Sequence, residues 1–167
     1  FCLSRGLGDV YKRQLPQDIG EHLKRLPEVM ERHPVRLAYL FGSSVRSLSQ
    51  SNDIDLAVLP DEGFSYTALY ADVSLALKTD RIDLVDLRFA PSYLVAEILT
   101  SGECIYSRSE LERCQFEAGK KSQWVEERSR TVKLFKEVRP MGLRREFIAN
   151  ALAELSLIHI SEPTRQA

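Results

Sequence analysis

The sequence predicts an α/β (α+β) fold, with a mixed β-sheet of about four strands flanked by helices and a C-terminal helical extension. Short apolar runs alternate with segments in which apolar residues recur every three or four positions, which is typical of a sheet covered by helices. Glycine and proline separate these segments. The chain has 167 residues, 44% of them hydrophobic, which is enough for one domain with an appendage.

Short apolar runs bounded by turn residues are expected to form the strands. They cover residues 35–41, 53–59, 81–87 and 103–106. The link between the first two is too short for a crossover helix, so we expect these strands to pair antiparallel. The sheet is therefore expected to be mixed.

Segments with three- and four-residue apolar periodicity are expected to form the helices. They cover residues 15–32, 64–78, 91–99, 109–139 and 144–155, with a short turn of helix from residue 42. Pro27 is expected to kink or split the first helix. Ser109 and Glu112 form a capping-box pattern at the start of the longest one, which breaks at Pro140.

The two ends of the chain, residues 1–14 and 156–167, resemble translated sequencing-adapter sequence. We exclude them from functional reasoning, as one excludes a cloning scar. The alternative is that they are genuine terminal tails. Between them we expect a main domain over residues 15–107 and a helical extension over residues 108–155.

The composition excludes several classes of protein. The net charge of −1 gives no general attraction to nucleic acid or to anionic membranes, so neither is an expected partner. No apolar run approaches the roughly 18 residues that a membrane-spanning helix needs. The three cysteines lack metal-site spacing and are too few and odd in number for a disulfide scaffold. They suit a reducing cytoplasm, where we expect the protein to reside.

The most informative feature is a pair of carboxylates at the start of the second strand. Asp53 and Asp55 lie two residues apart, so they point to the same face, while Ile54 points into the core. Two carboxylates this close repel each other unless a cation lies between them. Hard oxygen ligands on one face suit Mg²⁺, which also accepts substrate phosphates as ligands.

A candidate phosphate site lies where the first strand ends. Gly42 and Ser43 fall between that strand and a short helix, and free N–H groups at a helix start can bind phosphate. Glycine allows close approach to the backbone, and the hydroxyls of Ser43 and Ser44 add donors. Arg46 lies one helical turn further on and could reach the same phosphates.

A third carboxylate, Asp83, lies early on the third strand between apolar residues. On a strand next to Asp53 and Asp55 it would complete an acidic cluster, bind one metal ion and take a proton from an attacking hydroxyl. Asp86 lies three residues later, on the opposite face, and is expected to be solvated or to cap a turn.

These residues together resemble the DNA polymerase beta-type nucleotidyltransferase superfamily, and most closely its minimal nucleotidyltransferases, the MNT proteins. The superfamily signature is an apolar residue, Gly-Ser, a spacer and Asp-x-Asp. The segments FGSSVR, NDIDLAVL and RIDLVDL match that pattern, and VAEILTSGECIY resembles the family's terminal helix–glycine–strand unit. The resemblance covers about residues 35–106 and implies a nucleotidyltransferase fold.

The resemblance also implies roles for the residues. Gly42 and Ser43 would hold the triphosphate of an NTP, with ATP as the expected nucleotide donor. Asp53 and Asp55 would ligate two Mg²⁺ ions, and Asp83 would be the third carboxylate. Two metal ions stabilise the attacking and leaving oxygens of an in-line displacement. The expected reaction is the transfer of NMP to a hydroxyl, with release of pyrophosphate.

The resemblance further implies a partner. Many MNT proteins are antitoxins paired with an HEPN ribonuclease toxin, and some transfer AMP onto a tyrosine of that toxin. Two alternatives stay open: a non-catalytic module that neutralises its partner by contact, and a transferase acting on small molecules such as aminoglycosides. The NTP, the acceptor and the state of homo- or hetero-oligomerisation also stay open.

Other residues receive simpler interpretations. Tyr66 and Tyr70 could line a base pocket, although a core or surface position is the preferred interpretation. His22 and His33 are expected at the surface because neither has a partner at metal-ligand spacing. The basic stretch at residues 128–145 is expected to be a solvated helix face rather than an RNA contact.

Overall fold

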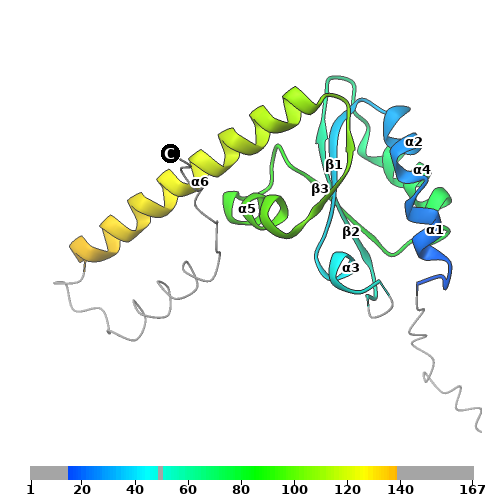
Figure 1. Ribbon diagram of the computed structural model, residues 1–167, viewed down its shortest axis with the longest axis horizontal. Helices are drawn as coiled ribbons and strands as arrows, with labels where there is room; N and C mark the ends of the chain where they lie inside the picture. Colours follow the sequence, from blue (N-terminus) through cyan, green and yellow to red (C-terminus); the bar gives the residue numbers. More distant parts are fainter. Residues whose placement is uncertain (1–14, 49–50, 139–167) are drawn as a thin grey trace, which may run out of the picture.

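The computed structural model describes residues 15–48 and 51–138, with side chains described as far as residue 133. Helices and strands alternate along the chain, as Figure 1 shows. In order they are α1 (Ile19–Leu23), α2 (Leu26–Glu31), β1 (Val35–Phe41), α3 (Ser43–Arg46), β2 (Ile54–Pro60), α4 (Tyr66–Leu77), β3 (Ile82–Asp86), α5 (Ser92–Ser101), β4 (Glu103–Ser107) and α6 (Glu110–Val138). The expected strands and helices within the described residues are all present, with ends displaced by a few residues.

The four strands form one mixed sheet in the order β3-β2-β1-β4. Strand β1 is antiparallel to both β2 and β4, whereas β2 and β3 run parallel. The predicted antiparallel pairing of the first two strands is therefore confirmed. The parallel pairing brings the first residues of β2 and β3 to the same edge of the sheet, and this edge carries the candidate site.

Alternate residues of the strands fill two separate cores, one on each face of the sheet. On the first face, Leu56 and Leu84 pack with apolar residues of α1, α2 and α4, among them Met30 and Leu69. On the second face, Ala57, Tyr39 and their neighbours pack beneath α5. Figure 1 shows the helices divided between the two faces in the same way.

Local signals in the sequence place the helix ends. The first predicted helix is split into α1 and α2, with Pro27 in the first turn of α2, where its missing N–H is not needed. Helix α5 begins after Pro91 and ends at Gly102, as expected. The Ser109 hydroxyl accepts from the Glu112 N–H at 3.4 Å, which confirms the predicted cap of α6.

Helix α6 is anchored to the sheet by its first half. The Tyr39 hydroxyl on β1 donates to Glu117 at 3.1 Å, and Trp124 is only 6% exposed. Burial, followed by the charge of Glu117, raises the pKa of Tyr39 above its usual range, so the phenol stays protonated and donates. Figure 1 shows α6 passing α5 and continuing beyond the sheet. None of the helices in the described part of the chain is both long enough and apolar enough to span a bilayer.

The predicted surface position of two histidines is wrong. His22 is only 5% exposed and lies 3.0 Å from the Asp18 carboxylate. The His33 imidazole lies 2.9 Å from the Asp72 carboxylate, which ties the chain after α2 to α4. His33 and Asp72 are 39 positions apart, so their contact leaves no local signal, whereas Asp18 and His22 are neighbours on one helix face. The predicted helix at residues 144–155 and both adapter-like ends lie outside the described residues.

Candidate active site

Asp55 and Asp83 lie side by side because β2 and β3 are parallel and pair in register. Asp55 is the direct partner of Asp83, and on its other side it is the partner of Phe41, the last residue of β1. Both carboxylates lie on the sheet face covered by α5, while Ile54 points into the opposite core. Asp53 directly precedes β2. The edge predicted from the sequence thus gathers aspartates from two strands.

The three carboxylates interact electrostatically. Burial, and then the charges of Asp53 and Asp83, raise the pKa of Asp55, and a hydrogen bond from the Ser43 N–H only partly offsets this. Within residues 15–48 and 51–138, no ion pair is found for any of the three. Asp55 is therefore the centre of a patch of uncompensated negative charge.

The three carboxylates are close enough to interact, but their side chains are not gathered around one point. Among the described residues, no three carboxylate, imidazole or thiol side chains are gathered closely enough to form a ready metal site. Asp83 is exposed, whereas Asp53 and Asp55 are half-buried. Carboxylates repel one another, so side chains of this kind spread until a cation draws them together. The backbone register, rather than the orientation of the side chains, is what brings them together here.

Gly42 is required by the conformation of the corner and by the room it leaves for Asp55. Its φ of 68° and ψ of −142° lie in a region that essentially only glycine adopts. A Cβ at this position would lie 2.8 Å from Cγ of Asp55 and closer still to one carboxylate oxygen. The absent side chain therefore makes space for the Asp55 carboxylate beside the Ser43 N–H.

The Ser43 hydroxyl belongs to a short chain of hydrogen bonds. Its Oγ lies 2.8 Å from Oγ of Ser51, and the Ser51 hydroxyl donates to the Asp53 carbonyl at 2.6 Å. Ser51 is 7% exposed, whereas Ser43 is exposed. This chain links the glycine-serine corner to the strand that carries two of the aspartates. Sequence reasoning missed Ser51, whose only signal was a hydroxyl residue two positions before Asp53.

The other predicted phosphate-binding residues are placed less favourably. Ser44 is 2% exposed, and its hydroxyl donates to the Phe41 carbonyl at 2.7 Å, so its side chain braces the corner instead of facing solvent. Arg46 is exposed at the end of α3. Helix α3 has only four residues, so little of a helix dipole is available, and the predicted contribution of a helix start is weaker than expected.

A second contact that sequence reasoning missed holds the loop before Asp53. The Arg81 guanidinium donates to the Asn52 carbonyl at 2.9 Å, and the Ile54 N–H donates to the Arg81 carbonyl at 3.0 Å. Arg81 thus connects the residue before β3 to both sides of Asp53. It fixes the relative positions of the two strands that carry the aspartates.

Tyr66 and Tyr70 brace β3 from α4. Their rings stack with centroids 6.4 Å apart, and their hydroxyls donate to the carbonyls of Leu84 at 3.1 Å and Asp80 at 2.8 Å. These bonds lie on either side of Asp83 in the sequence. Tyr66 is 46% exposed and Tyr70 is half-buried, so both lie at the surface of α4, one of the two positions preferred from the sequence.

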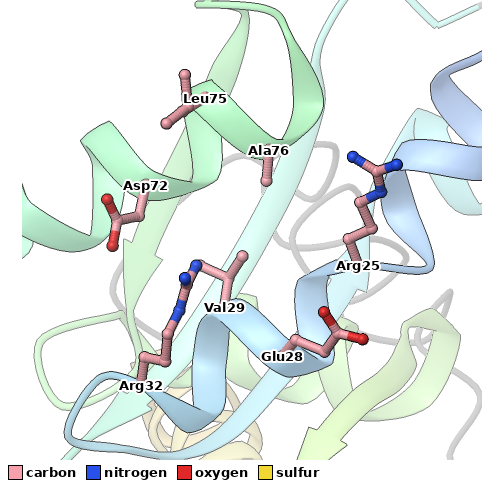
Figure 2. A pocket seen from close by; sticks show the side chains of 7 residues that line it. All are labelled: Arg25, Glu28, Val29, Arg32, Asp72, Leu75 and Ala76. Atoms are coloured by element: carbon pink, nitrogen blue, oxygen red, sulfur yellow. The ribbon is translucent and has the colours of Figure 1, made fainter.

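A surface groove between α2 and α4 lies on the other face of the sheet and is separate from the aspartates. Figure 2 shows its lining, with Glu28 on α2 and Arg25 and Arg32 at the two ends of that helix, opposite Asp72 and Ala76 of α4. Its charges are mixed, and the aspartates do not line it. This groove is therefore not the candidate site.

Comparison with protein families gives one match. The model of the family described as "Polymerase beta, Nucleotidyltransferase" matches residues 24–111, more than half of the chain. This span includes the glycine-serine corner and all three aspartates. A search of curated protein sequences found no match.

Solved structures show the same fold in toxin–antitoxin complexes. One is the tri-AMPylated HEPN toxin of Shewanella oneidensis in complex with MNT antitoxin: the matched chain is 24% identical with a TM-score of 0.55, over 72% of this chain and 98% of that one. A toxin–antitoxin with AMP-PNP is 24% identical with a TM-score of 0.57, over 70% and 98%. A mutant MntA–HpeT toxin–antitoxin is 26% identical with a TM-score of 0.55, over 69% and 95%.

Proposed function

Since the chain belongs to the polymerase beta nucleotidyltransferase family, we propose that it transfers NMP, in the form of AMP from ATP, to a hydroxyl of a partner protein in a Mg²⁺-dependent reaction. The observation that carries this proposal is the register of β2 and β3, which pairs Asp55 with Asp83 beside the Gly42–Ser43 corner. Aspartates that serve only to stabilise the fold are expected to be ion-paired, and no ion pair is found for these three within the described residues.

The residues at this edge fit divalent metal ions. Asp53, Asp55 and Asp83 offer only hard carboxylate oxygens, the ligands that Mg²⁺ prefers. Burial, and then the like charges of Asp53 and Asp83, raise the pKa of Asp55, and a bound cation would relieve the like charge. Gly42 leaves space at the Asp55 carboxylate that any other side chain would fill. When bound, two Mg²⁺ ions would polarise the phosphoryl group and stabilise the attacking and leaving oxygens.

The protein groups would position the nucleotide and move one proton. The backbone at Gly42, with Arg46, would hold the triphosphate, while the Ser43 N–H donates to the Asp55 carboxylate. The acceptor hydroxyl oxygen forms a bond to the α-phosphorus as the bond from that phosphorus to the bridging oxygen breaks, and pyrophosphate leaves. Asp83, exposed at the edge, would take the hydroxyl proton. The Ser44 side chain has a structural role in this scheme.

The acceptor we propose is an HEPN toxin, which would make the protein a cytoplasmic antitoxin. The chains matched in two of the solved complexes are covered over 95% and 98% of their length, so this chain has the elements of a whole partner in such complexes. The exposed position of Asp83 is accessible to a macromolecular acceptor. In one complex the HEPN toxin is described as tri-AMPylated.

Label transfer tests the proposal. The protein is mixed with Mg²⁺, ATP labelled on the α-phosphate and the HEPN protein from a neighbouring gene, and label on the HEPN protein is measured. We expect transfer by the wild type and by Asp86→Asn, and none by Asp55→Asn. Absence of transfer with every NTP and with Mg²⁺ or Mn²⁺ would contradict the proposal.

One observation favours a second candidate, neutralisation by contact alone. Helix α6 exposes Leu111 to 67% and Val125 to 52%, and apolar side chains on a long helix can dock a partner. If Asp55→Asn still neutralised the toxin fully in cells, contact would be sufficient. Protection of cells against aminoglycosides would instead support the small-molecule alternative.

A further inference from the structure

Ser51 occupies a buried position between the two halves of the candidate site. It lies in the segment between α3 and β2, and its side chain is 7% exposed. The Ser51 Oγ lies 2.8 Å from Oγ of Ser43 and 2.6 Å from the carbonyl oxygen of Asp53. One hydroxyl therefore touches both the predicted phosphate-binding corner and the strand entry that carries the predicted metal ligands.

The number of hydroxyl hydrogens fixes the direction of these two hydrogen bonds. A serine hydroxyl has a single hydrogen to donate. The Asp53 carbonyl can only accept, so the Ser51 hydrogen is committed to it. In the bond between the two serines, Ser43 must then be the donor and Ser51 the acceptor. Ser51 thereby ties the Ser43 side chain to the peptide of Asp53, and because the Ser43 hydrogen is used in this link, Ser43 holds the corner in place and does not itself donate to a phosphate.

We propose that Ser51 is a positioning residue for nucleotide binding, acting through Ser43 and Asp53 without touching the nucleotide itself. This inference rests on the proposed function. Because Ser51 is buried, it is not placed to contact a substrate. Its hydroxyl keeps the corner and the metal-binding strand entry in one relative arrangement before the nucleotide arrives. A neutral hydrogen bond has a net value that corresponds to about a fivefold change in an equilibrium constant.

The proposal predicts coupling between Ser51 and Ser43. Ser51→Ala should weaken the binding of Mg²⁺ with a non-hydrolysable ATP analogue by about fivefold, because the two hydrogen bonds act in series and removing the Ser51 hydroxyl breaks a single link between the corner and Asp53. In a Ser43→Ala background the same substitution should weaken binding by only about twofold, because the group that Ser51 orients is gone. KM for ATP should rise in parallel, while kcat changes less.

The test is a double-mutant cycle measured by calorimetry, with circular dichroism to show that each variant is folded. Ser74→Ala is the matched control: its hydroxyl also donates to a backbone carbonyl, that of Thr79 at 2.7 Å, but on α4. It should lower thermal stability without changing nucleotide affinity. Ser51→Thr, which keeps the hydroxyl, should bind within about twofold of wild type.

The outcomes separate this inference from the proposed function. The positioning role would be overturned if the losses of nucleotide-binding free energy in Ser43→Ala and Ser51→Ala were additive. It would also be overturned if Ser51→Thr weakened nucleotide binding as much as Ser51→Ala, in a protein that still transfers NMP. A wild type that binds the analogue but transfers nothing would refute the proposed function and leave the coupling measurable. A wild type that binds no nucleotide with metal would refute both.

Discussion

The pKa values of aspartates are shifted in opposite directions at the two ends of strands β2 and β3. Where the strands begin, burial and two neighbouring aspartates raise the pKa of Asp55. Where they end, a hydrogen bond from Arg108 lowers the pKa of Asp61. At that same end burial alone would raise the pKa of Asp86, but the hydrogen bonds from Arg88 outweigh it and the net shift is downward.

The difference shows which acidic residues stabilise the fold. The Arg88 guanidinium lies 2.7 Å from Asp86, and that of Arg108 lies 2.7 Å from Asp61. At the other end, the nearest cationic side chain with a described contact, Arg81, donates to a backbone carbonyl and not to a carboxylate. An acidic group without a counter-ion is unfavourable for folding, and such groups persist where function requires them.

Exchanging one aspartate at each end gives the largest expected contrast. Asp55→Asn should reduce NMP transfer at least about 100-fold, as expected when a group that stabilises the transition state is lost. It should also raise the melting temperature, because it removes like-charge repulsion. Asp86→Asn should do the reverse, lowering stability and preserving transfer. Transfer assays and thermal melts of both variants test this. A lower stability of Asp55→Asn than of the wild type would contradict the proposed repulsion at that end.

Alanine substitutions at two glycines with positive φ distinguish the cost of backbone strain from the cost of a clash with Asp55. Gly42→Ala should destabilise the protein by about 3 kcal/mol or more, because it adds a clash with Asp55 to the strain of the backbone. Gly63 has a φ of 79°, and a Cβ added there would meet no atom within 4 Å. Gly63→Ala should therefore cost only the backbone strain, about 1 kcal/mol. Chemical denaturation measures both, and equal effects would contradict the role of Gly42 in making room for Asp55.

The raised pKa of Asp55 predicts a pH dependence with a definite sign. The folded protein holds this proton more tightly than the unfolded chain, whose carboxyl has the ordinary value of 3.8. The contribution of Asp55 to stability is therefore most favourable below that value and is lost as the pH rises through the raised pKa. The stability gain of Asp55→Asn over wild type should grow across this window. A gain that shrinks with rising pH would contradict the assignment.

The smallest expected effect comes from an exposed ion pair at the far end. Arg108 and Asp61 are each 45% exposed in their side chains, so Arg108→Ala should lower stability only slightly, and less at high salt. Transfer activity should be unchanged. A large loss of activity would show that this end of the strands also takes part in function.

Local patterns predicted the sheet and the acidic edge. Alternation along β2 put Asp55 and Ile54 on opposite faces, and the short link before β2 required antiparallel pairing. Both inferences depend on neighbours in the chain. The same is true of the proline that splits α1 from α2.

Contacts between distant residues could not be predicted in this way. His33 meets Asp72 across 39 positions, and Tyr39 meets Glu117 across 78. The link from Ser43 to Ser51 depends on the path of the loop between α3 and β2, which no periodicity describes. The sequence therefore predicted which residues form the edge, but not which hydrogen bonds hold them.

Asp55 and Asp83, brought together by the register of β2 and β3, are expected to bind divalent metal with the nucleotide. Calorimetry with Mn²⁺ and a non-hydrolysable ATP analogue measures this binding. We expect metal-dependent binding that is weakened by more than about tenfold in both Asp55→Asn and Asp83→Asn, but not in Asp86→Asn. Unchanged binding in Asp55→Asn and Asp83→Asn would contradict the claim.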